Sequence, residues 1–102
     1  MPIMEISIVP VGTRRPSVSH YVAKVLKIVA KQKGVHYELT AMGTIIQAAS
    51  LKTLFNLAQK MHKAMLTLGV KRVVTTIKID DRTDKRLTMR GKINSVQTKV
   101  RN

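Results

Sequence analysis

The chain has 102 residues, 44% of them hydrophobic and 24% charged, a composition that fits one globular domain over residues 1–102 and excludes a disordered tail. Nineteen Lys and Arg residues against five Asp and Glu residues give a formal net charge of +14, so the protein attracts polyanions. With no cysteine and only three widely spaced histidines, the chain lacks the ligands of a zinc finger, and we expect no metal site.

The first half of the sequence passes from a strand pattern to a helix pattern and back. Over residues 4–11 apolar and polar residues alternate, which predicts a half-buried strand. Ser17 is a suitable N-cap, and valines spaced by three or four residues predict an amphipathic helix over 17–33 that ends at Gly34. Alternation resumes over 35–40, where we expect a second strand.

The second half repeats this pattern and adds a helix. A third strand is expected over 44–48, paired with the second as a hairpin. Ser50 can cap a second helix, and Gly69 can close it. The β-branched residues of 71–80 predict a fourth strand, and apolar residues at helical spacing predict a final helix from about Arg86.

The order βαββαβ predicts an α+β, ferredoxin-like fold. In this fold two helices cover one face of a four-stranded antiparallel sheet, and here a C-terminal helix is added. The other sheet face is open to solvent, a ligand or a second subunit. If the helices cover Met4, Ile6 and Ile8, the alternation of side chains predicts the residues of the open face. These are Glu5, Ser7, His36, Glu38, Thr40, Val74, Thr76, Lys78 and Asp80.

Two of the five acidic residues, Glu5 and Glu38, lie inside predicted strands, which are unfavourable places for carboxylates. On the open face of a cationic protein they indicate a local pocket for a cation or an amine donor. The alternative is a structural ion pair with Lys78, Arg72 or another lysine. The sequence leaves both interpretations open.

A basic loop precedes the first helix. Thr13, Arg14 and Arg15 lead into its N-terminus, where free backbone amides, the helix dipole and two guanidinium groups could hold a phosphate or sulfate. The loop matches neither a dinucleotide-binding nor a P-loop motif, so a solvated basic loop is the stronger interpretation.

The predicted hairpin turn contains a second candidate site. Gly43 could bring the backbone close to a ligand, Thr44 offers a hydroxyl, and Met42 precedes them. A plain hairpin turn is the alternative. Met61 and Met65 are expected in the core, and the three histidines at the surface or bonded within the protein.

Three stretches of the chain resemble the signature motifs of the small thiamine-binding protein family. Residues 5–13 read Glu-Ile-Ser-Ile-Val-Pro-Val-Gly-Thr, and residues 37–44 read Tyr-Glu-Leu-Thr-Ala-Met-Gly-Thr. Residues 72–82 read Arg-Val-Val-Thr-Thr-Ile-Lys-Ile-Asp-Asp-Arg. The motifs occur in the family's order, with matching helices between them, and cover nearly the whole chain.

The resemblance implies a non-catalytic protein that binds thiamine or its hydroxymethylpyrimidine moiety and needs no cofactor. Because the first 15 residues lack a signal-peptide pattern and no apolar run could cross a bilayer, we expect a cytoplasmic location. It also implies assembly through the sheets into a dimer of dimers, with the ligand at or near a subunit interface. An aminopyrimidine offers N–H donors to a carboxylate, and a thiazolium cation gains from a nearby negative charge. The implied ligand-binding residues are Glu5, Ser7, Ile8, Glu38, Met42, Gly43, Thr44 and Thr76.

Two other functions remain open. The chain could be an oligomeric structural or regulatory interaction module without a small-molecule ligand. It could also be a nonspecific polyanion or nucleic-acid binder, because of its charge. Its three aromatic residues, Tyr21, Tyr37 and Phe55, do not form the stacking platform of an RNA-recognition module. No apolar run is long enough for a membrane span, and we expect no membrane partner.

Overall fold

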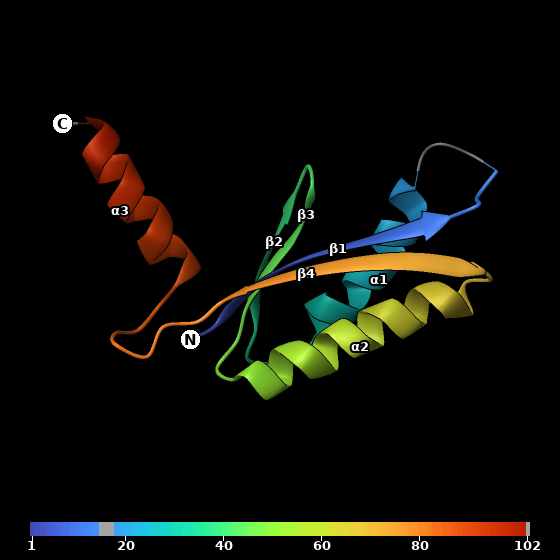
Figure 1. The fold of residues 1–102 in the computed structure, drawn as a ribbon, viewed down its shortest axis with the longest axis horizontal. Coiled ribbons are helices and arrows are strands. Elements are labelled where there is room, and N and C mark those ends of the chain that lie inside the picture. The colour runs from blue at the N-terminus through green and yellow to red at the C-terminus, as the bar shows by residue number, and fades with distance from the viewer. Residues whose placement is uncertain (15–17, 102) are drawn as a thin grey trace.

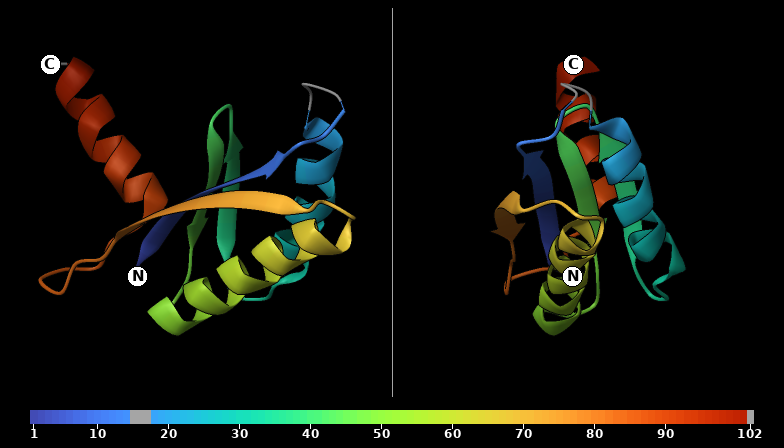
Figure 2. Two further views of the ribbon diagram at one scale, coloured as in Figure 1. Left: turned by 45° about the vertical axis from the view of Figure 1, so that its right-hand side comes forward. Right: turned by 90° about the vertical axis from the view of Figure 1, so that its right-hand side faces the viewer.

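The computed structural model describes residues 1–14 and 18–101. The elements are β1 (Ile3–Val11), α1 (Ser19–Lys31), β2 (His36–Thr40), β3 (Gly43–Gln47), α2 (Leu51–Thr67), β4 (Arg72–Asp80) and α3 (Met89–Arg101). The strands form one antiparallel sheet in the order β2-β3-β1-β4. Helices α1 and α2 cover one face of this sheet (Figures 1 and 2). This arrangement confirms the predicted ferredoxin-like α+β fold.

The strand registers define the two faces of the sheet. Ile6 of β1 lies opposite Thr44 of β3 and Ile77 of β4, on the face that the helices cover. Glu5, its neighbour in β1, lies opposite Ile45 and Lys78, on the open face. The same alternation extends to β2, so the residues predicted for the open face do lie on it.

The core lies between the sheet and the two covering helices. Helix α2 contributes five buried residues at spacings of three, one, three and four, so one continuous stripe faces the sheet. They are Leu54, Leu57, Ala58, Met61 and Met65. This stripe packs on Met4, Ile6 and Ile46, each of them at most 2% exposed. Met61 and Met65 are therefore core residues, as expected, and burial of each such side chain contributes about 1.5–3 kcal/mol.

Local signals define the ends of the helices. The Ser50 hydroxyl accepts a hydrogen bond from the Thr53 amide at 3.2 Å and so caps α2 as predicted. Gly69 closes α2 with a φ of +90°, which favours glycine. The predicted cap Ser17 lies outside the described residues, and Val18 precedes α1 without a side-chain cap. None of the described helices has the length and apolar character of a membrane span.

Helix α3 begins three residues later than predicted and projects beyond the sheet, away from α1 and α2 (Figures 1 and 2). The start was predicted near Arg86, but Leu87 lies before the helix, in a small buried cluster with Ile3. Thr88 then caps the helix by accepting a hydrogen bond from the Gly91 amide at 3.0 Å. The Met89 amide also donates to Gln47 Oε1 of β3 at 2.7 Å, which attaches α3 to the sheet.

Candidate functional site

Seven of the eight predicted ligand residues line two separate hollows on opposite faces of the sheet. The first, here called the inner pocket, lies between β1, the β2–β3 hairpin and the helices, with a volume of about 350 Å³. The second, the face hollow, lies over the open face beside α3 and has a volume of about 500 Å³. Both volumes fall in the range of small-molecule sites, roughly 300–1,000 Å³.

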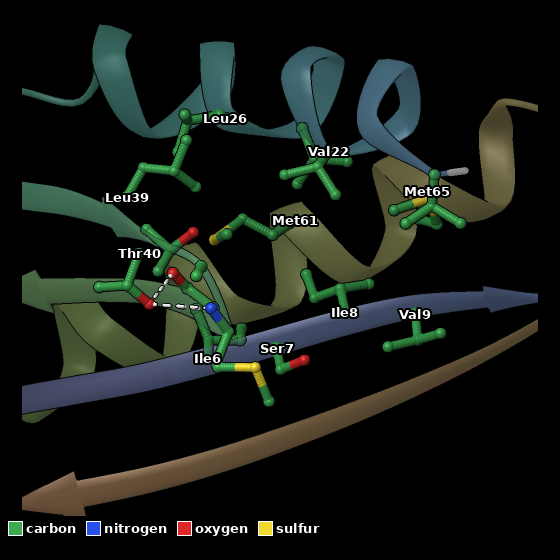
Figure 3. Close-up of a pocket in the computed structure, with 16 residues that line it drawn as sticks. Ile6, Ser7, Ile8, Val9, Val22, Leu26, Leu39, Thr40, Met61 and Met65 are labelled. Carbon is green, nitrogen blue, oxygen red and sulfur yellow. Dashed lines mark hydrogen bonds between the residues drawn. The ribbon is translucent and has the colours of Figure 1, made fainter. Parts of the chain in front are cut away.

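The inner pocket is mainly apolar. Val22 and Leu26 of α1 point into it from one side and Ile8 of β1 from the other (Figure 3). Met61 and Met65 of α2 also line it. It thus brings together five of the eight predicted ligand residues. These five are Ser7, Ile8, Met42, Gly43 and Thr44.

Thr44 supplies a polar group at the inner pocket. The residue is 5% exposed, and its hydroxyl forms no hydrogen bond with the described part of the chain. Every fully buried polar side-chain atom there has a partner, so the Thr44 hydroxyl retains access to the pocket. It can donate one hydrogen bond to a ligand and accept others.

The hairpin turn beside the inner pocket is held by Thr40, which the sequence analysis did not assign to the site. Its Oγ1 accepts hydrogen bonds from the amides of Met42 and Gly43 and donates to the Gly43 carbonyl at 2.8 Å. A Cβ atom on Gly43 would lie 3.0 Å from the Ile6 carbonyl oxygen. Gly43 therefore permits the close approach of the hairpin to β1. A threonine three residues before a turn glycine could have indicated this side-chain bond.

The face hollow contains the two carboxylates that the sequence analysis singled out. Glu38 of β2 lies opposite Ile45 of β3, and Ile45 lies opposite Glu5 of β1, so the two carboxylates flank one apolar side chain. Two strand spacings separate their backbones by about 10 Å. The rest of the lining is apolar or charged. It consists of Ile3, Lys78, Ile79, Asp80, Met89, Lys92 and Ile93.

Neither glutamate of the face hollow takes part in an ion pair with another described residue. The two ion pairs among these residues join Asp80 to Lys92 and Arg82 to Asp84. The expected alternative, a structural pair between a glutamate and Lys78 or Arg72, is therefore absent from this part of the chain. Both glutamates are exposed and can accept hydrogen bonds from a cation or an amine donor.

Helix α3 completes one side of the face hollow, which the sequence analysis did not anticipate. Met89 is buried, whereas Ile93 is 47% exposed and borders the hollow. The Lys92–Asp80 ion pair holds the first turn of the helix against β4. The apolar stripe of the predicted C-terminal helix was the available signal, but the sequence does not say where such a helix packs.

The remaining candidate residues lie elsewhere. Thr76 is exposed on the open face opposite Ser7, and it lines neither hollow. Thr13 and Arg14 border a third hollow with Lys71, whose volume is about 750 Å³. Arg15 lies outside the described residues. The anion site at this loop stays a prediction.

Comparisons with known proteins identify relatives along almost the whole chain. A family model described as thiamine-binding protein matches residues 4–97. The UPF0045 protein YqgV of Bacillus subtilis (strain 168) is 44% identical over 99 residues, with 94% of each chain covered. A UPF0045 protein of Methanothermobacter thermautotrophicus is 40% identical over 96 residues, which cover 94% of this chain and 96% of the relative.

Solved structures give the same result for the fold. The hypothetical protein MJ1052 from Methanocaldococcus jannaschii superposes with a TM-score of 0.86 at 33% identity, covering 94% of this chain and 95% of its own. TM0486 from Thermotoga maritima has a TM-score of 0.78 at 15% identity, with coverages of 93% and 97%. At that identity the likeness concerns the fold alone. The family model, which matches residues 4–97, shows that this chain belongs to the thiamine-binding protein family, and its curated relatives carry the family name UPF0045.

Proposed function

We propose that this protein binds thiamine or its hydroxymethylpyrimidine moiety in the face hollow and acts as a cytoplasmic binding protein rather than an enzyme. The observation that carries this proposal is the pair of carboxylates, Glu5 and Glu38, on either side of Ile45 without an ion-pair partner among the described residues. The family to which the chain belongs supports the choice of ligand. TM0486, a fold neighbour, is described only provisionally as a thiamine biosynthesis or salvage protein.

The geometry of the face hollow suits a flat heteroaromatic ring with N–H donors. A ring lying on Ile45 would have a carboxylate at each of two edges, because the glutamates stand on the strands on either side. An aminopyrimidine can donate its amino hydrogens to one carboxylate. The positive thiazolium ring of thiamine gains from the same negative charges, since Coulomb attraction grows as the surroundings become less aqueous.

Charge distribution also favours a cationic ligand at this place. The chain as a whole carries a formal charge of +14. Nevertheless, Glu5, Glu38 and Asp80 converge on the face hollow, where only Lys78 and Lys92 oppose them. Since Lys92 is paired with Asp80, the remaining groups leave a local excess of negative charge. A cation is therefore attracted here and repelled by most of the remaining surface.

We infer that a second copy of the chain closes the site. Beyond its first turn, α3 exposes an apolar stripe, with Ile93 47%, Val96 61% and Val100 79% exposed. The open sheet face also exposes Val9 and Val74. Exposed apolar stripes of this kind mark interaction sites. Burial of both surfaces between copies gives a dimer of dimers with the ligand near a subunit interface.

Light scattering during size-exclusion chromatography tests this assembly. The wild-type chain should elute with the mass of a tetramer, and Val96→Asp should reduce that mass because it places a charge in the interface. Asn94→Asp, at an exposed position on the other side of the same helix, serves as the control because it adds the same single negative charge. A monomeric wild-type protein would contradict the proposed assembly.

Isothermal titration with thiamine, thiamine phosphate and hydroxymethylpyrimidine tests the ligand and its site. The titration needs enough salt to mute the net charge of the protein. Glu38→Gln keeps the shape of the side chain and removes its charge, so we expect roughly tenfold weaker thiamine binding, about 1.4 kcal/mol. Thr44→Val removes the hydroxyl of the inner pocket and should leave the affinity unchanged.

The pattern of results distinguishes the ligand from its location. If only Thr44→Val weakened binding, the ligand would be assigned to the inner pocket, and the protein would still be a thiamine-binding protein. Flat titrations with all three compounds, for a protein shown to be folded by circular dichroism, would disprove the binding function. They would leave the oligomeric interaction module as the better description, for which the exposed stripe of α3 is the supporting observation.

A further inference from the structure

All five acidic side chains lie on the open face of the sheet or in the loop after β4, and the helix layer on the other face carries only basic charges. Glu5, Glu38 and Asp80 point to the open face, and Asp81 and Asp84 follow in the loop after β4. Helices α1 and α2, which cover the other face, contain no acidic residue. They carry six lysines, all exposed, here called the helix-layer lysines. These are Lys24, Lys27, Lys31, Lys52, Lys60 and Lys63.

The helix-layer lysines form one ridge on each helix. At 3.6 residues per turn, the three lysines of α1 lie within about 60° of one another around the helix axis, and the three of α2 within about 80°. Small or polar residues stand on or beside each ridge, such as Ala23 and Ala30 on α1 and Asn56 and Gln59 on α2. Each ridge therefore presents cations that a large, rigid anion can approach without obstruction.

No described acidic residue neutralises these ridges. Neither of the two ion pairs among the described residues includes a helix-layer lysine. Lys24 and Lys27 are three residues apart, and Lys27 and Lys31 four, spacings at which like charges repel on a helix. In the isolated protein these lysines repel one another, and a bound polyanion would reduce that repulsion.

We propose that the outer surface of α1 and α2 binds the phosphate backbone of duplex nucleic acid, independently of the ligand site on the open face. A duplex carries one negative charge per about 1.7 Å of its axis, and lysines that neutralise phosphates release condensed counterions. A surface with this density of negative charge can contact several lysines of both ridges at once, and these lysines have no acidic partner among the described residues. The phosphates of the duplex would thus neutralise lysines that no acidic residue of α1 or α2 neutralises.

The position of the exposed apolar residues favours a nucleic acid over an anionic membrane. An amphipathic helix that lies on a bilayer inserts bulky apolar side chains next to its lysines. On α2 the exposed Leu51, Phe55 and Leu66 lie instead on the flank toward β4, the side on which His62 contacts Thr75. Phe55 and Leu66 each stand three residues from a lysine of α2, whereas α1 exposes no bulky apolar residue, so the ridge on α1 lacks the side chains that would enter a bilayer.

The position of the aromatic residues favours a duplex over a single strand. Proteins that bind single strands usually stack bases on exposed aromatic rings. Tyr21 is half-buried against the core, and Tyr37 also packs against it from the helix-covered face of the sheet. Phe55 of α2 is 53% exposed, but one ring does not make a platform on which successive bases can stack. The expected contacts are therefore to phosphates and do not depend on base sequence.

Fluorescence anisotropy with a short labelled DNA duplex, over about 50–200 mM KCl, tests the proposal. The triple variant Lys24→Gln/Lys27→Gln/Lys31→Gln should reduce the slope of log affinity against log salt by about 2.7, or about 0.9 for each phosphate that is no longer neutralised. The matched control is Arg90→Gln/Lys99→Gln/Arg101→Gln, which removes the same charge from exposed positions of α3. Its slope should change by less than about 1.

Several results would overturn the proposal. An equal change of slope in both triple variants would show that only net charge attracts the duplex. No measurable binding of the wild-type protein to the duplex at the lowest salt would exclude the surface altogether. Tighter binding to vesicles containing phosphatidylserine, abolished in the α1 variant, would assign the ridge to a lipid surface. Circular dichroism and thiamine titration of each variant separate these results from unfolding and from the ligand site.

Discussion

Glu5 of β1 and Lys78 of β4 lie directly opposite each other on the open face, but the ion pairs of the described residues join other side chains. Lys78 borders the face hollow and opposes a cationic ligand there. We predict that Lys78→Gln strengthens thiamine binding about two- to threefold, because it removes a positive charge in a solvent-accessible setting of high effective dielectric constant. Isothermal titration measures the change.

Arg72→Gln is the matched control for this prediction. Arg72 is exposed on the same face of the same strand, six residues from Lys78, or about 20 Å along an extended strand. Its removal lowers the net charge equally but does not alter the hollow. If both variants raise the affinity to the same extent, the effect comes from net charge, and the assignment of the ligand to the face hollow loses its support.

A second prediction concerns His62 of α2 and Thr75 of β4, whose Nδ1 and Oγ1 atoms lie 2.6 Å apart. Thr75→Val removes this hydrogen bond and leaves a half-buried imidazole nitrogen without its partner. We expect a loss of about 1 kcal/mol in the free energy of unfolding, measured by urea denaturation. Thr76→Val changes the next residue, which is exposed on the open face, and should cost less than about 0.5 kcal/mol.

The fold and the open face were predictable because both depend on local patterns. The two-residue period of β1 and β4 determines which residues share a face, and the registers agree with that assignment. Ser50 and Gly69 were also predictable, because they begin and end α2 through contacts with residues close to them in sequence. For the same reason the prediction that Met61 and Met65 belong to the core was confirmed.

The composition of the candidate site was less predictable because it depends on how distant elements meet. The alternation of side chains along β1 predicted that Glu5 and Ser7 share the open face of the sheet. Only the packing of α3 forms a hollow around Glu5, and the sequence did not predict this packing. The side chain of Thr44 points to the helices, so it lines a different hollow from Glu38. No local pattern could say that Leu87 is buried beside Ile3.

Gly43 provides a third prediction, on the stability of the hairpin. A Cβ atom there would lie 3.0 Å from the Ile6 carbonyl oxygen, and this backbone atom is fixed within the sheet. We expect Gly43→Ala to reduce the free energy of unfolding by about 1–3 kcal/mol, as overpacking typically does. Urea denaturation measures the loss. Ala41→Ser adds an atom at an exposed position of the same hairpin and should be nearly neutral, so an equal loss in both variants would contradict this explanation.

The loop between β4 and α3 provides the last prediction, on pH. Arg82 Nε donates a hydrogen bond to Asp84 Oδ1 at 2.8 Å, and a second guanidinium nitrogen of Arg82 pairs with Oδ2. These bonds hold the pKa of the Asp84 carboxyl below its ordinary value, about 3.9 in an unfolded chain. A lowered pKa in the folded state contributes stability above the unfolded pKa, and this stability is lost as the pH falls through the folded pKa.

Carbon-detected NMR titration of the Asp84 carboxyl group tests this directly. In Arg82→Gln the pKa of Asp84 should rise toward about 3.9, because an amide cannot supply two charged donors. In the wild-type protein Asp84→Asn should lower stability at neutral pH and have no effect at a pH well below the folded pKa, where the carboxyl is protonated in both states. Because both side chains are exposed, the change in stability should be small. An unchanged Asp84 pKa in Arg82→Gln would show that the pair does not persist in solution.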